Sequence, residues 1–323
     1  MSNLERDPAE TVCVVEPAEG VEVLEPREVP LGGPRALPVR RTLPQRSRSL
    51  VGAWCFADSY GPVEAGRPGT MDVPPHPHTG LQTVSWLYAG EIEHRDSVGS
   101  VEMIAPGQVN LMTAGSGIQH SEVSTGAAPT LHGVQLWIAL PDTARRTAPL
   151  FEHHVPEPFR HGDAEIRVFV GELLGHRSAV TVFTELVGAQ IDLPAHGRVE
   201  LPVDPAHEHG LLVDAGSPEF AGTPVPRDHL AVVPVGPSTL EVAAGDEPVR
   251  AVLLGGAPLG ESIVMWWNFV GRSHDEIAEF RARWQADVIG GGTASGPFGR
   301  VDGYPGAALP APELPNARLR PRG

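Results

Sequence analysis

The stretch His76-Pro-His-Thr-Gly-Leu-Gln-Thr-Val-Ser-Trp86 decides the fold, together with a second stretch, Met112-Thr-Ala-Gly-Ser-Gly-Ile-Gln-His-Ser-Glu122. Each stretch carries two metal-type donors spaced two residues apart, His76 with His78 and His120 with Glu122. Side chains at positions i and i+2 of a strand point to the same face. Each pair can therefore present two donors to one interior point, one pair from each of two neighbouring strands.

Three imidazoles and one carboxylate leave one or two positions open on a five- or six-coordinate metal. Nitrogen and oxygen donors suit iron, manganese, nickel, copper or zinc, and the set is similar to an expanded form of the two-histidine, one-carboxylate iron site. A closed structural zinc site more often uses cysteine. A lone His-x-His near prolines is more often a surface or turn feature, but the strand-rich surroundings and the turn at Pro106-Gly107 favour a metal site here.

The surroundings of these motifs predict an all-β protein. The chain has 34 prolines and 37 glycines, and short strands separated by turns follow closely from Thr83 to Leu140 and again from Ile166 to Leu254. A capping box at Ser273 predicts one short helix, with Ile277, Phe280 and Trp284 packing on one face. We expect two tandem antiparallel β-barrels and four regions: a flexible extension (1–20), the barrel with the metal site (21–150), a second barrel (151–290) and an extended tail (291–323).

Composition excludes several classes of function. The formal net charge of −16 argues against binding nucleic acid, and we interpret Arg40-Arg41 as solvated surface. No apolar run approaches the roughly 18 residues that a membrane span needs. The start has no secretory signal pattern, and two cysteines do not form a disulfide framework. These features predict a cytoplasmic protein.

Beyond its two metal motifs, the sequence resembles the pirin branch of the cupin superfamily. The resemblance covers about residues 21–290. Besides the two stretches quoted above, it is carried by Val23-Leu-Glu-Pro-Arg-Glu28, Gly90-Glu-Ile-Glu-His-Arg-Asp-Ser97, Pro106-Gly107 and His132-Gly-Val-Gln-Leu-Trp137.

This resemblance implies a bicupin fold with one iron-type site in the first barrel, held by His76, His78, His120 and Glu122. Most cupins place a carboxylate four residues after the second histidine, where this chain has Gln82. An amide is a poorer ligand than a carboxylate. The carboxylate role then passes to Glu122, as in pirins, and Gln82 is expected to remove a negative charge near the metal.

Alternation along residues 91–96 places further residues around the site. Because Glu91, Glu93 and Arg95 favour solvent, His94 faces inward, either as an acid/base or hydrogen-bond partner near the metal or as a barrel histidine without a chemical role. Gln135 is a candidate for the same cavity, and Trp86 and Trp137 are expected in the core. His207-Glu-His209 has no matching donor pair downstream, so the second barrel is expected to hold no metal.

Three functions remain open from the sequence. The resemblance implies an Fe(II)-dependent quercetin 2,3-dioxygenase-like enzyme on small chelating aromatic substrates, with Glu122 or His94 taking the substrate proton. The alternative is an iron-dependent regulatory protein that acts through protein partners, because animal pirins are regarded as transcription cofactors. In the third, the metal only stabilises the barrel.

Overall fold

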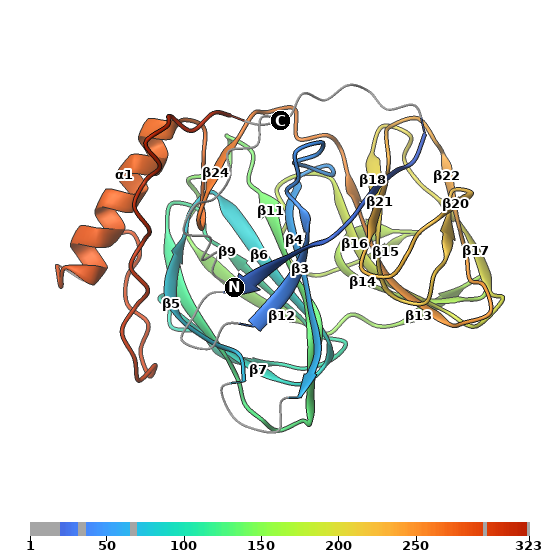
Figure 1. Ribbon diagram of the computed structural model, residues 1–323, viewed down its shortest axis with the longest axis horizontal. Helices are drawn as coiled ribbons and strands as arrows, with labels where there is room; N and C mark the ends of the chain where they lie inside the picture. Colours follow the sequence, from blue (N-terminus) through green and yellow to red (C-terminus); the bar gives the residue numbers. More distant parts are fainter. Residues whose placement is uncertain (1–19, 32–36, 65–69, 293–295, 322–323) are drawn as a thin grey trace.

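The computed structural model describes residues 20–31, 37–64, 70–292 and 296–321. Almost all regular structure in this part of the chain is β-strand, in two barrels side by side, with a helix near the C-terminus (Figure 1). This confirms the expected all-β bicupin fold with a short C-terminal helix. The expected extension at 1–20, including Cys13, lies outside the described residues except for Gly20, whereas Cys55 is a buried free thiol. No helix in these ranges is long and apolar enough to cross a membrane.

Two antiparallel sheets form the first barrel. The larger one has the strand order β12 (Leu150–His154), β9 (Val109–Thr113), β6 (Leu81–Ala89), β11 (Thr130–Ala139), β4 (Trp54–Glu64), β3 (Leu37–Leu43) and β2 (Arg27–Leu31). The smaller one has the order β5 (Asp72–His78), β10 (Ile118–Ser124), β7 (Ile92–Asp96) and β8 (Val101–Ile104). Both metal motifs therefore lie on the smaller sheet, on the neighbouring strands β5 and β10.

The second barrel repeats this plan. Its larger sheet has the order β1 (Glu22–Leu24), β21 (Leu230–Val233), β18 (Glu208–Ala215), β23 (Val249–Gly256), β16 (Leu186–Leu193), β14 (Ala164–Leu173) and β13 (Phe159–His161), and β15 (His176–Arg177) pairs with β14. Its smaller sheet has the order β17 (Arg198–Pro202), β22 (Thr239–Ala243), β19 (Glu219–Phe220) and β20 (Thr223–Pro224). In β17, Val199 and Leu201 are buried between exposed neighbours, which is the alternation of a half-buried strand.

Each end of the described chain crosses to the other barrel. Strand β1 was expected to open the first barrel, yet it pairs with β21 of the second. The segment after Gly256 was expected in the second barrel, yet β25 (Phe269–Gly271), which pairs with β24 (Val264–Trp266), forms a bridge from Phe269 to Thr79 of the first. Pairing between strands far apart in sequence therefore links the two barrels across the expected boundaries, and the division into four regions stays a prediction.

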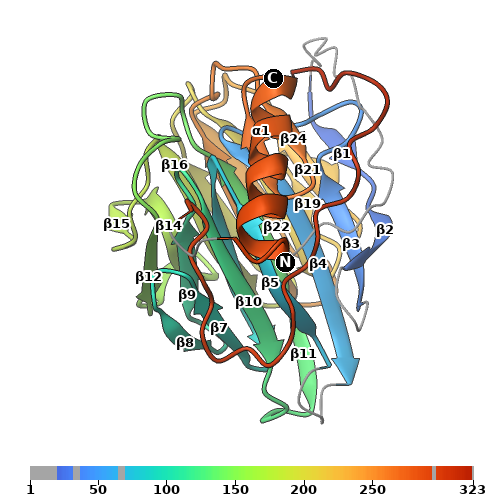
Figure 2. The ribbon, with the colours of Figure 1, turned by 90° about the vertical axis from the view of Figure 1, so that its left-hand side faces the viewer.

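The helix α1 (His274–Trp284) begins at the predicted cap and packs as expected. The Ser273 hydroxyl accepts a hydrogen bond from the backbone N–H of Glu276. Ile277 and Trp284 are buried against Trp267 and Phe298. A short π-helix, η1 (Gln285–Ile289), follows, and the extended tail then runs beside α1 over the first barrel (Figure 2).

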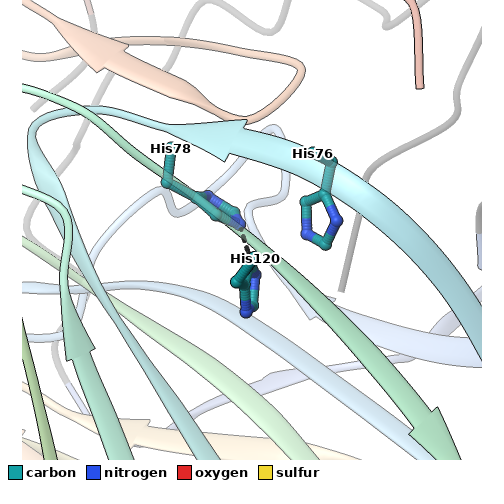
Figure 3. A group of neighbouring side chains, drawn as sticks. All are labelled: His76, His78 and His120. Atoms are coloured by element: carbon teal, nitrogen blue, oxygen red, sulfur yellow. Dashed lines mark hydrogen bonds between the residues drawn. The ribbon is translucent and has the colours of Figure 1, made fainter. Parts of the chain in front are cut away.

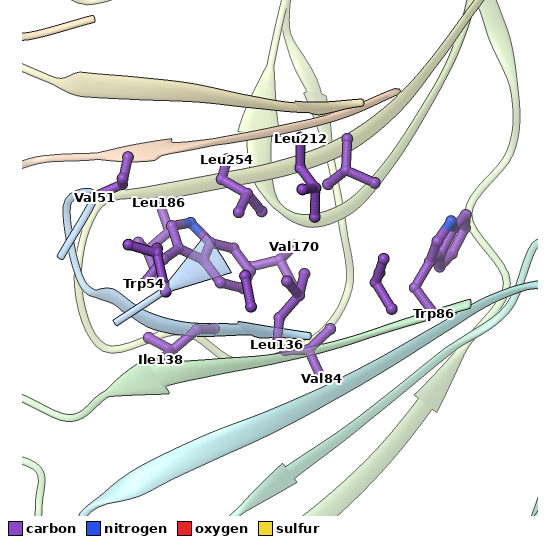
Figure 4. Packing of buried hydrophobic residues seen from close by; sticks show 14 of the residues in the cluster. Val51, Trp54, Val84, Trp86, Leu136, Ile138, Val170, Leu186, Leu212 and Leu254 are labelled. Atoms are coloured by element: carbon purple, nitrogen blue, oxygen red, sulfur yellow. The ribbon is translucent and has the colours of Figure 1, made fainter. Parts of the chain in front are cut away.

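The two barrels share a hydrophobic core. Trp54 and Trp86 of the first barrel lie against strands of the second (Figure 4). The Trp86 indole stacks on Phe169 with ring centroids 4.7 Å apart. The indole N–H of Trp54 donates to the backbone carbonyl of Val187, and that of Trp86 donates to the side chain of Gln190. Trp86 is therefore a core residue, as expected, and one face of β6 is buried by the second barrel.

Arg41 is not the surface residue that the sequence suggested. Its guanidinium is buried and makes two parallel hydrogen bonds to the carboxylate of Asp58, at 2.7 and 2.8 Å. The cation also lies 4.3 Å from the centre of the Phe56 ring. The partner strand β4 lies 17 residues further along the chain, so the run Arg40-Arg41 gives no indication of it.

Candidate metal centre

Strand pairing brings the two predicted donor pairs together. His76 and His78 lie on β5, and His120 of the neighbouring β10 is the direct register partner of His76. The pairing of β10 with β5 shifts by one residue between His120 and Glu122, whereas on its other side Glu122 stays in register with His94. All four predicted ligand side chains are buried, and the three imidazoles turn toward a common point (Figure 3).

The distances among the three imidazoles suit a single metal ion. His76, His78 and His120 each offer a donor atom within 4.8 Å of the others, and so do His94, His120 and Glu122. The Nε2 atoms of His78 and His120 are 3.1 Å apart. Two nitrogens bound to one metal at about 2.1 Å and at right angles lie about 3.0 Å apart. His120, which belongs to both groups, therefore lies at the centre of the candidate site.

A hydrogen bond on the far side of the His76 ring leaves its Nε2 directed at the site. The Nδ1 atom of His76 lies 2.8 Å from the carbonyl of Pro74, which only accepts, so this nitrogen carries the proton. His76 Nε2 is buried and has no hydrogen-bond partner among the described residues. Such an orphaned nitrogen fits a metal ligand, whose other ring nitrogen is held by a backbone carbonyl or carboxylate.

Burial keeps these imidazoles in the neutral form that binds metals. Desolvation lowers the pKa of His76 to about 3 and holds the pKa values of His78 and His120 well below the usual value. The ligands therefore do not have to lose a proton at neutral pH before a metal binds.

His94 lies behind His120, as the alternation predicted. Its Nε2 is 3.1 Å from a carboxylate oxygen of Asp96, and its Nδ1 is 3.3 Å from Nδ1 of His120. Asp96 also accepts the backbone N–H groups of Val98 and Ser100, which fix its position. A proton on Nδ1 of His120 can therefore be donated to His94, whose own Nε2–H is donated to Asp96. This chain orients His120 with its Nε2 toward the site.

Glu122 is positioned by residues that the motifs did not reveal. Its Oε1 atom accepts a hydrogen bond from the Ser85 hydroxyl at 3.0 Å, and the same hydroxyl oxygen lies 2.9 Å from Oε1 of Gln135. Gln135 thus lies beside the site, as the sequence suggested. Trp137 is buried as expected, but its ring also contacts His78 edge-on at 5.2 Å. Ser85 could have been found from the alternation of side chains along β6, because its side chain lies on the same face of the strand as those of Thr83 and Leu87.

Gln82 does not face the ligands, which corrects the expected loss of charge near the metal. Its amide nitrogen donates to the hydroxyl of Thr113 at 2.8 Å and to the carbonyl of Thr181 at 2.9 Å. Thr181 belongs to the second half of the chain. Because Gln82 and Ser85 are three residues apart on one strand, their side chains point to opposite faces.

We expect Gln82→Glu to leave metal content unchanged and to lower stability. The carboxylate lacks the amide N–H groups and would oppose the carbonyl of Thr181 in a buried position, at a cost of about 1–3 kcal/mol. Urea unfolding together with metal analysis measures both effects. A change in metal stoichiometry at unchanged stability would contradict this placement of Gln82.

The second barrel brings no comparable set of donors together among the residues that the structure describes. His207 and His209 have ring centroids 6.2 Å apart, and His207 lies 3.3 Å from the exposed Glu185. The interior is filled by apolar side chains, including Phe220 and Leu253. That this barrel holds no metal stays a prediction.

Comparison with known proteins adds to this geometry. The family model described as Pirin matches residues 36–138, and the model described as Pirin C-terminal cupin domain matches residues 188–290. A Pseudomonas aeruginosa protein provisionally named quercetin 2,3-dioxygenase is 41% identical over 290 residues, which cover 90% of this chain and 89% of that protein. A pirin-like protein of Caulobacter vibrioides is 37% identical over 77% of this chain and 88% of its own length. The crystal structure of a quercetin 2,3-dioxygenase from Acinetobacter baumannii has a TM-score of 0.85 and 37% identity, covering 94% of this chain and 98% of that one.

Proposed function

We propose a function for this chain, which belongs to the pirin family and has its bicupin fold. It is an Fe(II)-dependent dioxygenase that acts on flavonol-type substrates such as quercetin, and it works in the cytoplasm on small chelating aromatic molecules. Two similar proteins, from Pseudomonas aeruginosa and Acinetobacter baumannii, carry the name of this activity. The net charge of −16 disfavours nucleic acid as a partner.

The observation that carries the proposal is the buried donor set itself. His76, His78 and His120 bring ring nitrogens within 4.8 Å of one another, and Glu122 supplies an oxygen from the same strand as His120. Four such donors leave positions open for a chelating substrate, and we assign iron among the metals that this nitrogen and oxygen set suits. When bound, the ion supplies Lewis acidity and a redox couple.

The protein's own residues supply orientation and proton transfer. Glu122 accepts the proton that a flavonol hydroxyl loses on chelation, and Ser85 holds one of its oxygens by a hydrogen bond. His94 was the other expected proton acceptor. Because its two ring nitrogens face His120 and Asp96, it supports the reaction by orienting His120.

Oxygen uptake tests the proposal. Protein purified without oxygen should contain one equivalent of iron and should consume oxygen with quercetin and related flavonols. Glu122→Gln keeps a metal-binding oxygen but is a weaker base, so we expect it to slow turnover by about 10²–10⁴-fold. A fully iron-loaded protein that consumes no oxygen with any flavonol would contradict the proposed dioxygenase activity. Binding of a protein partner only in one oxidation state of the metal would then identify the regulatory alternative.

A further inference from the structure

The wall that faces the metal ligands is built from two rows of side chains. Cross-strand partners in the larger sheet of the first barrel place Phe56 beside Trp137, Trp137 beside Thr83, Thr83 beside Met112 and Met112 beside Phe151. This mainly apolar row contacts the ligand side of the barrel at two of its members. Trp137 meets His78 edge-on, and the Phe151 ring stacks on His94 with centroids 4.4 Å apart.

The adjacent row on the same face is polar. The same strand register aligns Arg41, Asp58, Gln135, Ser85, Asn110 and His153. All but His153 are buried, and His153, on the edge strand β12, is partly exposed. Most members pair within the barrel: Arg41 with Asp58, and Ser85 with both Gln135 and Glu122. This polar row therefore runs from a buried ion pair, past the carboxylate ligand, to the solvent.

Asn110 is the member of the polar row with an unpaired buried atom. Its side-chain oxygen lies 2.7 Å from Nδ1 of His153, but its amide nitrogen has no hydrogen-bond partner among the described residues, although only 3% of Asn110 is exposed. Leaving a buried donor unpaired costs about 1–3 kcal/mol. Exchanging the amide oxygen and nitrogen only moves the unpaired atom to the oxygen. Asn110 therefore keeps one polar atom available on the inner face, directly beside Ser85.

We propose that Asn110 determines substrate specificity by hydrogen bonding an oxygen substituent of the aromatic substrate. The inference rests on the proposed function, because it takes the chelating oxygens of the substrate to face the histidines and Glu122. An aromatic ring then lies along the apolar row at Met112 and Phe151, and a hydroxyl group on that ring reaches the Asn110 amide. The site thus favours flavonols with hydroxyl groups beyond the chelating pair.

Two ligands that differ in this feature test the role of Asn110. Quercetin and 3-hydroxyflavone share the chelating hydroxyl and carbonyl groups, but 3-hydroxyflavone has no other hydroxyl. With iron-loaded protein kept free of oxygen, we expect Asn110→Ala to weaken quercetin binding about five- to tenfold and to change 3-hydroxyflavone binding less than about twofold. Asn110→Val, which fills the position but offers neither a donor nor an acceptor, should show the same selective loss.

Thr113→Ala is the matched control, because Thr113 lies on the same strand with its side chain on the opposite face, bonded to Gln82. It should bind both flavonols like the wild type, and all three variants should retain one equivalent of iron. Equal weakening for both flavonols, or no weakening, would overturn the role of Asn110 alone. Wild-type protein that binds neither flavonol would overturn the proposed substrate class and this role together.

Discussion

Replacing His120 by alanine is expected to abolish stoichiometric metal binding. His120 belongs to both groups of convergent donors, faces Nε2 of His78 at 3.1 Å, and is held in place by His94. Glu122→Ala removes the single carboxylate of the proposed set and should have a similar effect. Elemental analysis of protein purified without oxygen measures metal per chain, and circular dichroism establishes whether the fold is retained.

The matched control for this loss is the double variant His207→Ala with His209→Ala in the second barrel. Among the residues that the structure describes, no third donor atom lies within 4.8 Å of both histidines, so the variant should keep one equivalent of metal. If the variant lacking both His120 and Glu122 still binds one equivalent, the four-residue site is wrong. If the control loses metal while remaining folded, the second barrel binds it.

Local periodicity explains why the two donor pairs could be predicted from the sequence to lie close together. Paired donors at i and i+2 need only a strand to converge, and both pairs lie in strands. The residues around them depend on which face of a strand looks into the barrel. Gln82 was therefore assigned to the wrong face of β6, and Ser85 was missed. The two positions are three residues apart on this strand, so only Ser85 faces the inside of the first barrel.

Long-range pairing lies beyond this kind of argument. The segment Val21–Glu25 predicts a strand, but the partner of this strand, β21, begins at Leu230. Asn110 could not be singled out from the sequence for the same reason. Its position between Ser85 on β6 and His153 on β12 depends on the pairing of β9 with both strands. Local sequence determines the type of element, whereas the assembly of distant strands determines which polar groups meet.

Arg41→Ala is expected to lower the free energy of unfolding by about 3–5 kcal/mol, because it leaves the Asp58 carboxylate buried and unpaired. Urea denaturation monitored by tryptophan fluorescence measures this loss. Its neighbour provides the matched control. Arg40 is paired with Asp228 at a partly exposed position, so Arg40→Ala should cost only about 1 kcal/mol.

The combined variant Arg41→Met with Asp58→Asn separates the cost of an unpaired charge from the loss of packing. Methionine is close to arginine in volume, asparagine keeps the shape of aspartate, and no charge remains buried, so this variant should be clearly more stable than Arg41→Ala. If both variants lose the same stability, the loss comes from removing the ion pair itself and not from leaving the Asp58 carboxylate unpaired. Because Asp58 is the register partner of Gln135, metal content measured in the same variants would show whether disturbing this end of the polar row reaches Glu122.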